Sequence, residues 1–499
     1  MSYPCRVIVD MLQTMPISIE LVGAFLLLAH IVIGFVATIL ISTSRTPSAA
    51  IAWVLAIIFI PFLGALWFLL VGAGRLPKAR RDKQREVNAL IRSRTPGLDE
   101  VSHRDEWPGW LGTAVTMNVE LGALPMVGGN RATLIDSYEG SFAAMIADIE
   151  TATEYVHVEF YILVLDDSTR PFFRALERAR ERGVEVRVLS DHVSSFMFPN
   201  RRETQDFLAR IGAQWYAMLP LRPLHGQWQR PDLRNHRKLV VVDGRVGFTG
   251  SQNLIDSSYL KKKNIARGLH WHELMVRVVG PAVRELNAVF LTDWYSESGE
   301  LLVFDSTPVL VGTADIDLDA QVLASGPSFE NDNNRKLFVY LLHSAQKRIS
   351  ITSPYFVPDE STLLAIISAA SRGVAVELFV SEIGDQYFVY HAQRSYYEAL
   401  LDAGVAIYLY PAPTVLHSKH FSIDDDVAVI GSSNMDIRSF SLNMEVSLLV
   451  QGRAFVRAMR AIEDGYRANS TRLDPAVWRA RPLAGKINDA LARLTSSLQ

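Results

Sequence analysis

One pattern of residues occurs twice in this chain of 499 residues, with the second copy 181 positions after the first. Each copy contains a His, a Lys two positions later, an Asp five positions after the Lys, and a closing Gly, Ser and Asn. The first copy consists of His236, Lys238, Asp243, Gly250, Ser251 and Asn253, and the second of His417, Lys419, Asp424, Gly431, Ser432 and Asn434. A match at six positions without a gap is difficult to reach by chance, so we expect the fold to use both copies.

The residues around each motif indicate a β-hairpin. The apolar run after the first Lys is typical of a buried strand, and the Asp-Gly pair that follows is a turn signal. Because side chains alternate along a strand, His236 and Lys238 point to one face, and Ser251 and Asn253 repeat this offset on the next strand. An imidazole, an ammonium, a hydroxyl and a carboxamide aimed at one place suit a phosphodiester, and this chemistry requires no metal or other cofactor.

The segments around the motifs are also repeated, which extends the duplication to whole domains. In each half, helical and strand-like patterns alternate as in βαβ units, which form parallel sheets covered by helices. In the first half the helices cover 141–153 and 169–182 and the strands 156–164 and 183–188; in the second, the helices cover 335–345 and 361–371 and the strands 349–356 and 373–378. We therefore expect an α/β fold with tandem domains at 129–312 and 313–499, each a mixed, mostly parallel sheet flanked by helices.

Two stretches near the N-terminus are apolar and uncharged. They cover residues 21–41 and 50–72, and each is long enough to cross a hydrocarbon core of about 30 Å at about 1.5 Å per helical residue. A cleaved signal peptide is the alternative for the first stretch, but a strongly basic start is missing and a second apolar stretch follows at once. We expect residues 1–74 to form a two-helix transmembrane hairpin.

Basic residues are distributed unevenly around these stretches. The loop between them carries Arg45, whereas six basic residues follow the second stretch: Arg75, Lys78, Arg80, Arg81, Lys83 and Arg85. By the positive-inside rule, we expect the N-terminus and the bulk of the chain to lie in the cytoplasm, as in a multi-pass membrane protein. The same residues open a basic linker over 75–128 and suit the headgroups of anionic lipids.

Composition narrows the classes of partner. A net charge of −3 does not fit a dedicated nonspecific nucleic-acid binder, so we expect no nucleic-acid partner. The single cysteine, Cys5, excludes an intramolecular disulfide framework, and the sequence has no Cys/His cluster with zinc spacing.

The C-terminal stretch 476–498 has apolar residues at roughly helical spacing with basic residues between them. The apolar residues are Trp478, Leu483, Ile487, Leu491 and Leu494, and the basic ones are Arg479, Arg481, Lys486 and Arg493. An amphipathic helix of this kind lies in the membrane interface or docks on the body of the domain, and the sequence leaves both possibilities open.

Read as His-x-Lys-x4-Asp, the repeated motif resembles the signature of the phospholipase D superfamily. Within that superfamily the chain is similar to the bacterial cardiolipin synthases over nearly its whole length. The similarity is carried by the two apolar stretches and by the phrases at 46–53, 235–238, 372–374 and 434–445. It implies two phospholipase D-like domains, related by pseudo-twofold symmetry, that meet so that both motifs form one active site.

The resemblance also implies a mechanism. One His attacks phosphorus to give a phosphohistidine, and the other protonates the departing alcohol and then deprotonates the incoming one. By family tendency His236 is the nucleophile and His417 the general acid and base. Glu445, 28 residues after His417, matches the family's His-orienting acid, and Glu273 is the candidate counterpart for His236. For the synthases, phosphatidylglycerol is typically both donor and acceptor, giving cardiolipin and glycerol.

The other motif residues have expected roles as well. Lys238 and Lys419 reduce the repulsion between a phosphodiester anion and its attacker and stabilise the charge added in the transition state. Asp243 and Asp424 belong to the signature and complete the candidate catalytic set, although their turn positions suggest support of the fold. The candidate phosphate-binding or supporting residues are Ser251, Asn253, Ser432 and Asn434.

Several other functions stay open at this point. A hydrolytic phospholipase D or another phosphatidyltransferase would use the same residues with a different acceptor. A membrane-tethered nuclease would use the same motif, but the acidic balance and the two apolar stretches argue against it. A noncatalytic scaffold is disfavoured by the intact His and Lys of both copies. The sequence does not indicate whether phosphatidylethanolamine is a co-substrate, nor the oligomeric state.

Overall fold

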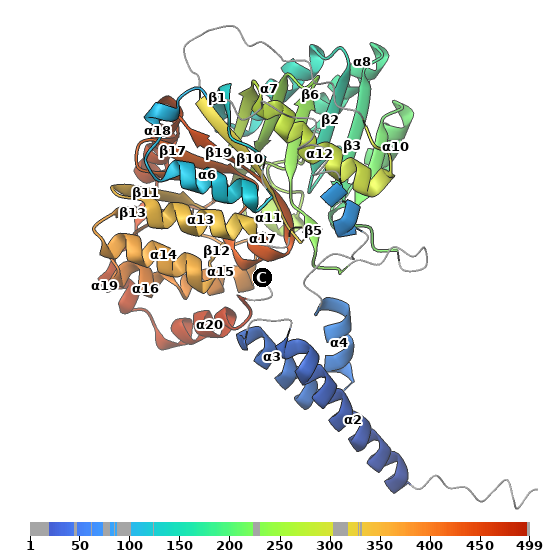
Figure 1. Cartoon of the computed structure of the whole chain (residues 1–499), viewed down its shortest axis with the longest axis vertical. Coiled ribbons are helices and arrows are strands. Elements are labelled where there is room, and N and C mark those ends of the chain that lie inside the picture. The colour runs from blue at the N-terminus through green and yellow to red at the C-terminus, as the bar shows by residue number, and fades with distance from the viewer. Residues whose placement is uncertain are drawn as a thin grey trace, which may run out of the picture. The chain divides into compact units, whose positions relative to one another are not determined.

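A computed structural model describes residues 19–43, 47–60, 62–72, 80–83, 85–86, 101–122, 124–222, 230–302, 318–327, 329 and 332–496. Contacts within the chain separate two compact units, residues 1–74 and 75–499 (Figure 1). The predicted domain boundary at 312 and 313 lies outside the described residues, as do Arg45, Arg75 and Lys78.

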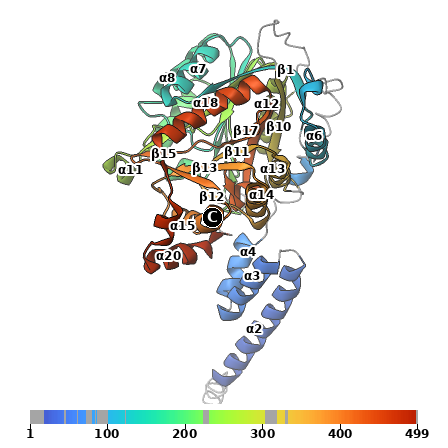
Figure 2. The same cartoon turned by 90° about the vertical axis from the view of Figure 1, so that its left-hand side faces the viewer.

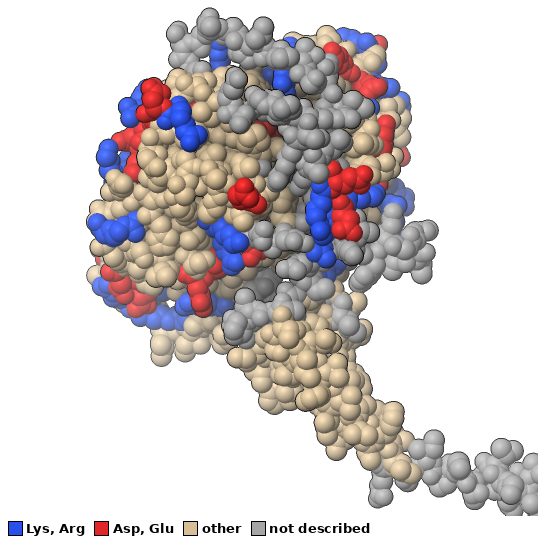
Figure 3. Space-filling view, viewed as in Figure 1, with Lys and Arg blue, Asp and Glu red and all other residues tan. Residues whose placement is uncertain are grey.

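The first unit contains three apolar helices, α2 (Ile19–Ser42), α3 (Pro47–Phe59) and α4 (Leu63–Val71). Among the described residues, α2 is the one helix that is long and apolar enough to cross a membrane, and most of its side chains are exposed. The visible described surface of this unit is uncharged (Figure 3). Such a surface is what a lipid-facing helix requires, and it suggests a membrane-associated protein.

The predicted second span is divided between α3 and α4. Phe62, just before α4, has a φ of 57°, which is outside the helical region and interrupts the helix. Each of the two helices is shorter than the roughly 20 residues that a complete span needs. The ring of Trp53 in α3 nevertheless packs edge-on against Phe68 in α4, with the ring centroids 5.4 Å apart. A hairpin of two complete spans therefore stays a prediction.

Part of the basic linker contacts helix α12 (Ala282–Ser298) of the second unit. Arg80 forms an ion pair with Glu297, and the ammonium of Lys83 lies 5.0 Å from the centre of the Tyr295 ring. These two charges therefore take part in packing. Between residue 101 and the sheet, the described residues form the 3-10 helix η1 (Arg104–Glu106) and α6 (Leu111–Glu120).

The strands of the second unit form two similar sets. The first set is β1 (Val127–Ile135), β2 (Tyr155–Phe160), β3 (Glu185–Asp191), β4 (Gln214–Met218), β6 (Lys238–Val242), β7 (Val246–Gly250) and β9 (Met275–Val279). The second set is β10 (Leu318–Ser325), β11 (Arg348–Thr352), β13 (Ala375–Ser381), β14 (Ala406–Tyr410), β16 (His420–Ile423), β17 (Val427–Gly431) and β19 (Asn443–Gln451), with β20 (Thr471–Arg472) at its edge. The short strands are β5 (Arg234–Asn235), β8 (His270–His272), β12 (Phe356–Val357), β15 (Thr414–Leu416) and β18 (Met435–Asp436).

The two sets join into one continuous sheet. Its order is β20-β14-β13-β11-β16-β17-β19-β10-β1-β9-β7-β6-β2-β3-β4, and β1 and β10 meet antiparallel at the junction. The prediction of a mixed sheet is confirmed, but the prediction that it is mostly parallel is wrong. Only the pairs β2·β3, β3·β4, β11·β13 and β13·β14 of this order are parallel. The motif strands are joined by tight hairpins, and a hairpin connection makes neighbouring strands antiparallel.

Helices cover both faces of the sheet (Figures 1 and 2). In the first half they are α7 (Tyr138–Glu150), α8 (Arg170–Glu181), α9 (Ser194–Met197), α10 (Arg201–Arg210), α11 (Lys262–Ala266) and α12. In the second half they are α13 (Asn333–Ser344), α14 (Glu360–Ser371), α15 (Tyr387–Arg394), α16 (Tyr397–Asp402), α17 (Ile437–Ser441), α18 (Arg453–Asn469), α19 (Pro475–Arg479) and α20 (Leu483–Arg493). The expected helices and strands of both halves are present within a few residues of their predicted bounds.

The core on one face of the sheet is shared by the two halves. Side chains of α12, such as Leu286, and of α18, such as Met459, belong to one buried cluster with strand residues of both sets. On the other face, α7 and α8 cover the first set and α13 and α14 cover the second, in separate clusters. The shared core fixes the two halves relative to each other, which the site requires.

Candidate active site

The first motif reaches the second half through a short parallel pairing. Strand β5 pairs with the start of β19, with Asn235 opposite Met444, and the backbone N–H of His236 donates to the carbonyl of Met444 at 2.8 Å. The residues that follow this pair are His236 and Glu445, and both belong to the site. Nδ1 of His236 lies 3.0 Å from both carboxylate oxygens of Glu445.

The second motif is held in the same way by the first half. Strand β8 pairs with β15, with His272 opposite Leu416, and the backbone N–H of His417 donates to the carbonyl of His272 at 2.8 Å. Nδ1 of His417 then lies 2.8 and 2.9 Å from the two carboxylate oxygens of Glu273.

The expected pairing of histidines with carboxylates is therefore wrong in one respect. Glu273 was the candidate counterpart for His236, and Glu445 was identified by its spacing from His417, but each carboxylate contacts the histidine of the opposite half. The cause lies in the pairing of strands between the halves. Strand β5 pairs with β19 and β15 pairs with β8, so the histidine that follows β5 or β15 lies beside the glutamate of the other half. Because a carboxylate accepts hydrogen bonds, both contacts favour the proton on Nδ1 and leave Nε2 as the reactive nitrogen.

The two lysines lie beside their histidines and are buried. Nζ of Lys238 donates to the carbonyl of His236 at 2.6 Å, and Nζ of Lys419 donates to the carbonyl of His417 at 2.7 Å. Nζ of Lys419 also lies 3.3 Å from Nε2 of His417. Burial, followed by the charge of Lys419, lowers the pKa of Lys238, and burial lowers the pKa of Lys419 to about 8. The influence of Lys419 on Lys238 indicates that both halves supply charge to one site.

Burial also lowers the pKa of both imidazoles. The pKa of His236 falls to about 4, with Glu445 opposing the fall and Lys238 adding to it. The pKa of His417 falls well below its usual value through burial, Lys419, Lys238 and His236, in that order. Both rings are therefore neutral near pH 7 in the resting site, as a nucleophile and a base must be.

The two carboxylates differ. Burial raises the pKa of Glu273 to about 7, although Lys419 and the hydroxyls of Ser251 and Tyr259 oppose the rise. Burial acts on Glu445 in the same direction, but the charge and hydrogen bond of His236 outweigh it, and the pKa of Glu445 is lowered. Near neutral pH the first pair holds an ionised carboxylate, and the second pair shares a proton.

Ser432, Ser251 and Asn253 support these carboxylates directly or through a hydroxyl. The hydroxyl of Ser432 donates to Glu445, and the amide of Asn253 donates to the hydroxyl of Tyr259 at 2.8 Å, which in turn donates to Glu273 at 3.0 Å. Ser251 accepts the backbone N–H of Leu274 at 2.9 Å. The backbone N–H of Asn434 donates to the hydroxyl of Ser439 at 3.1 Å. The phosphate-binding role of these residues stays a prediction.

The motif aspartates lie at the far end of their strands from the histidines. Asp243 follows β6, whose five residues extend for about 16 Å beyond Lys238. Its carboxylate accepts the backbone N–H groups of Thr153, Glu154 and Tyr155, each at 2.9 Å. Asp424 accepts those of Gln346, Lys347 and Arg348 at 2.7 to 3.2 Å. These hydrogen bonds support the fold, as the turn positions suggested, and a catalytic role of Asp243 and Asp424 stays a prediction.

Sequence reasoning missed several neighbours of the histidines. Arg237 crosses to the second half, where Nε donates to the carbonyl of Glu445 at 3.0 Å, and it pairs with Asp293 of α12. The Tyr161 ring lies 5.1 Å from the ring of His236, between centroids. The position of Arg237 between His236 and Lys238 could have indicated its role, since a strand places it on the face opposite to them. Tyr161 lies outside the motif, and no sequence pattern indicated its place beside His236.

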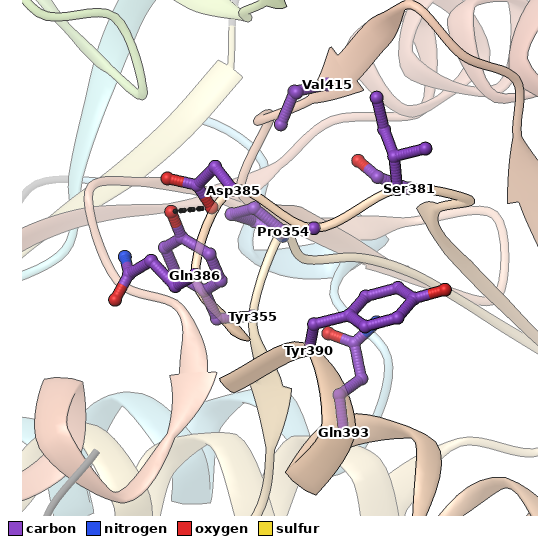
Figure 4. Close-up of a pocket in the computed structure, with 10 residues that line it drawn as sticks. Pro354, Tyr355, Ser381, Asp385, Gln386, Tyr390, Gln393 and Val415 are labelled. Atoms are coloured by element: carbon purple, nitrogen blue, oxygen red, sulfur yellow. Dashed lines mark hydrogen bonds between the residues drawn. The ribbon is translucent and has the colours of Figure 1, made fainter. Parts of the chain in front are cut away.

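A cavity with Tyr355 in its wall lies near His417. It has about 270 Å³ of space between atoms, which includes open solvent, and lies where β11 and β13 end (Figure 4). The hydroxyl of Tyr355 donates to Asp385 at 3.0 Å, and Tyr390 and Gln393 of α15 line the same space. The ring centroid of Tyr355 is 6.1 Å from that of His417. Within the described ranges, no three His, Cys, Asp or Glu side chains are grouped so that they could hold a metal ion.

Comparison with known proteins gives concordant results. A family model described as "Cardiolipin synthase, PLD-like domain" matches residues 145–294 and 338–464. The cardiolipin synthase of Geobacillus kaustophilus is 31% identical over 487 residues, which cover 96% of this chain and 94% of that protein. Cardiolipin synthase A of Pseudomonas putida is 34% identical over 442 residues, which cover 87% and 89%. A solved phosphatidylserine synthase from Haemophilus influenzae has a TM-score of 0.56 at 12% identity, covering 77% of this chain and 99% of that one, and so shares its fold.

Proposed function

Because the chain belongs to the cardiolipin synthase, PLD-like family, we propose that it transfers a phosphatidyl group from one phosphatidylglycerol molecule to another, giving cardiolipin and glycerol. The observation that carries the proposal is the exchange of carboxylates between the halves, since Glu445 holds His236 and Glu273 holds His417. Neither half is complete alone, and two imidazoles and two ammonium groups act on one phosphate.

In the first step, Nε2 of His236 attacks the phosphorus of the donor lipid. Glu445 accepts a hydrogen bond from Nδ1–H of His236, so the lone pair of Nε2 is available. The P–N bond forms as the P–O bond to glycerol breaks, and the proton shared by His417 and Glu273 passes through His417 to the glycerol oxygen. Lys238 and Lys419 offset the charge that gathers on the phosphoryl oxygens. The ionised state of Glu445 and the raised pKa of Glu273 support this division of roles.

In the second step, a headgroup hydroxyl of the acceptor phosphatidylglycerol gives its proton to His417. Its oxygen attacks phosphorus, and the P–N bond to His236 breaks. Cardiolipin is released, and both histidines return to their starting protonation states. Water in place of the acceptor would give phosphatidic acid by the same route.

The proposal includes the finer organisation of the chain. The two domains are 129–312 and 313–499, with pseudo-twofold symmetry, and the strand order that is the same from each end of the shared sheet supports this. Two spans anchor the chain in the inner membrane with the catalytic domains in the cytoplasm. The excess of basic residues after the second apolar stretch supports that orientation and contact with anionic lipids.

The test is an assay of the purified full-length protein in phosphatidylglycerol vesicles, with cardiolipin, phosphatidic acid and glycerol measured together. We expect cardiolipin and glycerol in equal amounts. Phosphatidic acid as the main product would replace the transferase by a hydrolase. His343→Ala, at an exposed position in α13, is the matched control and should keep the full rate. Adding phosphatidylethanolamine in a parallel reaction reports whether it serves as a co-substrate.

A further inference from the structure

The C-terminal stretch forms two helices, α19 and α20, separated at Pro482, in place of one continuous amphipathic helix. Helix α20 packs along α15, and both lie at one end of the second unit (Figures 1 and 2). The contact is polar and specific: Nδ1 of His391 lies 2.7 Å from Asp489, and the hydroxyl of Tyr387 donates to Asn488 at 3.0 Å. Docking on the body of the domain is therefore what the structure shows for the inner side of α20.

The outer side of the same helix pair is apolar and exposed. Along α20 the exposed side chains Leu483, Ile487, Leu491 and Leu494 repeat at the spacing of one helical stripe, and Ile487 is 51% and Leu494 78% exposed. The neighbouring start of α15 adds the exposed rings of Tyr387 and Phe388. A row of large apolar side chains over two packed helices is a contiguous patch of the kind that marks an interaction surface.

The charges on this face have one sign. The one acidic residue in α20, Asp489, is 2% exposed and turned inward, where it pairs with His391 and Arg481. Lys486 and Arg493 flank the apolar stripe. Apolar side chains bordered by basic ones fit a bilayer surface that carries anionic headgroups.

Helix α15 connects this face to the chemistry. Its outer side carries Tyr387 and Phe388, and its inner side carries Tyr390 and Gln393, which line the cavity of Figure 4. Tyr355, on the opposite wall of that cavity, is in ring contact with His417. One helix and one cavity thus separate the apolar face from the catalytic histidine.

We propose that the outer face of α15 and α20, defined by Tyr387, Phe388, Leu483, Ile487, Leu491 and Leu494, docks on the surface of an anionic lipid bilayer. It inserts its apolar side chains below the headgroups and so brings the cavity near His417 to the level of the substrate lipids. This contact is additional to the anchorage by the N-terminal unit. Its effect on the reaction rests on the proposed function, whereas the insertion itself does not.

The first test reads insertion directly and needs no turnover. The native cysteine is changed by Cys5→Ser, single cysteines are introduced by Ile487→Cys or Phe388→Cys, and an environment-sensitive dye is attached to the full-length protein in phosphatidylglycerol vesicles. We expect quenching by lipid-borne quenchers at both positions. The control is Lys347→Cys, at a side chain that is 74% exposed before the start of β11, where we expect no quenching. Absence of quenching at 487 and 388 overturns the proposal. So does a dye that is shielded from water but not reached by the lipid quencher, because a protein partner or a second copy then covers the face.

The second test separates docking from folding. The double variant Ile487→Glu with Leu491→Glu should lower cardiolipin formation from bilayer phosphatidylglycerol about tenfold, and it should leave the rate on micellar short-chain phosphatidylglycerol within about twofold of the unchanged protein. Lys347→Glu is the surface control and should change neither rate. An equal fall with both substrates would mean that the helix pair only supports the fold, and would overturn the proposal.

Discussion

The pairs His236–Glu445 and His417–Glu273 share one geometry and differ in the acidity of their carboxylates. In each pair, Nδ1 lies 2.8 to 3.0 Å from both carboxylate oxygens, and a short parallel pairing between the halves delivers the two residues. Yet the pKa of Glu445 is lowered, whereas burial raises that of Glu273 to about 7. A duplicated motif therefore does not produce duplicated chemistry, because the electrostatic surroundings of each copy are set by its neighbours.

The difference has burial as its first cause. At Glu273, burial raises the pKa of the carboxyl more than Lys419 and the hydroxyls of Ser251 and Tyr259 lower it. At Glu445, the charge and hydrogen bond of His236 outweigh burial and lower the pKa. The proposed division of roles, attack by His236 and proton transfer by His417, rests on this asymmetry.

Removing either imidazole should have the largest effect. We expect His236→Ala and His417→Ala each to lower the rate of cardiolipin formation by at least about 10⁴-fold, with the protein still in the membrane. Mass spectrometry of alkali-quenched protein, which preserves phosphohistidine, should find the phosphatidyl group on His236. A group mapped to His417 would reverse the assignment, and an active variant of either kind would refute a shared site.

The carboxylates should then show unequal effects. Glu445→Gln removes an ionised group that holds the nucleophile, and we expect a rate loss of about 10³-fold. Glu273→Gln replaces a group that is already partly protonated near pH 7, and we expect a loss of about tenfold. The measurement is kcat in phosphatidylglycerol vesicles at pH 7. Equal losses would show that the two pairs are electrostatically equivalent.

The pH dependence sharpens the same comparison. The nucleophile must be neutral, and the pKa of His236 is about 4, so activity is lost as the pH falls through that value. The proton of the second pair is lost as the pH rises through about 7, the pKa of Glu273. We expect kcat/KM to be highest between these values. In Glu273→Gln the basic limb near pH 7 should be lost; an unchanged basic limb would exclude Glu273 as its source.

The smallest effect on rate is expected at the turn aspartates. Asp243→Asn and Asp424→Asn should each lower the free energy of unfolding by about 1–3 kcal/mol, because each carboxylate accepts several backbone N–H groups, and should change kcat little. The loss should be larger at Asp243, which also pairs with Arg245 at 3.0 Å. Thermal unfolding measures both. Asp425→Asn, at a neighbouring side chain that is 71% exposed, is the control and should leave stability unchanged.

In the first unit, hydropathy predicted one of the two apolar helices correctly and did not predict the interruption of the other. The apolar run at 21–41 predicted one helix, and α2 covers it. The run at 50–72 is equally apolar, and Pro61 and Gly64 predict a bend in it; the structure divides it before Phe62. Hydropathy measures the preference of a segment for lipid, whereas the backbone conformation at one residue decides whether the helix continues.

The sequence by itself determined the chemical groups of the site: the spacing of His236, Lys238, His417 and Lys419 requires no knowledge of the fold, because alternation along a strand already places each His and Lys on one face. It also indicated the duplicated α/β architecture. Only the tertiary structure decided that Glu445 serves His236 and Glu273 serves His417, and that the two carboxylates differ in acidity. The physical reason is that pairing between halves and burial depend on contacts between residues far apart in the chain, and spacing within one copy of the motif contains no information about them.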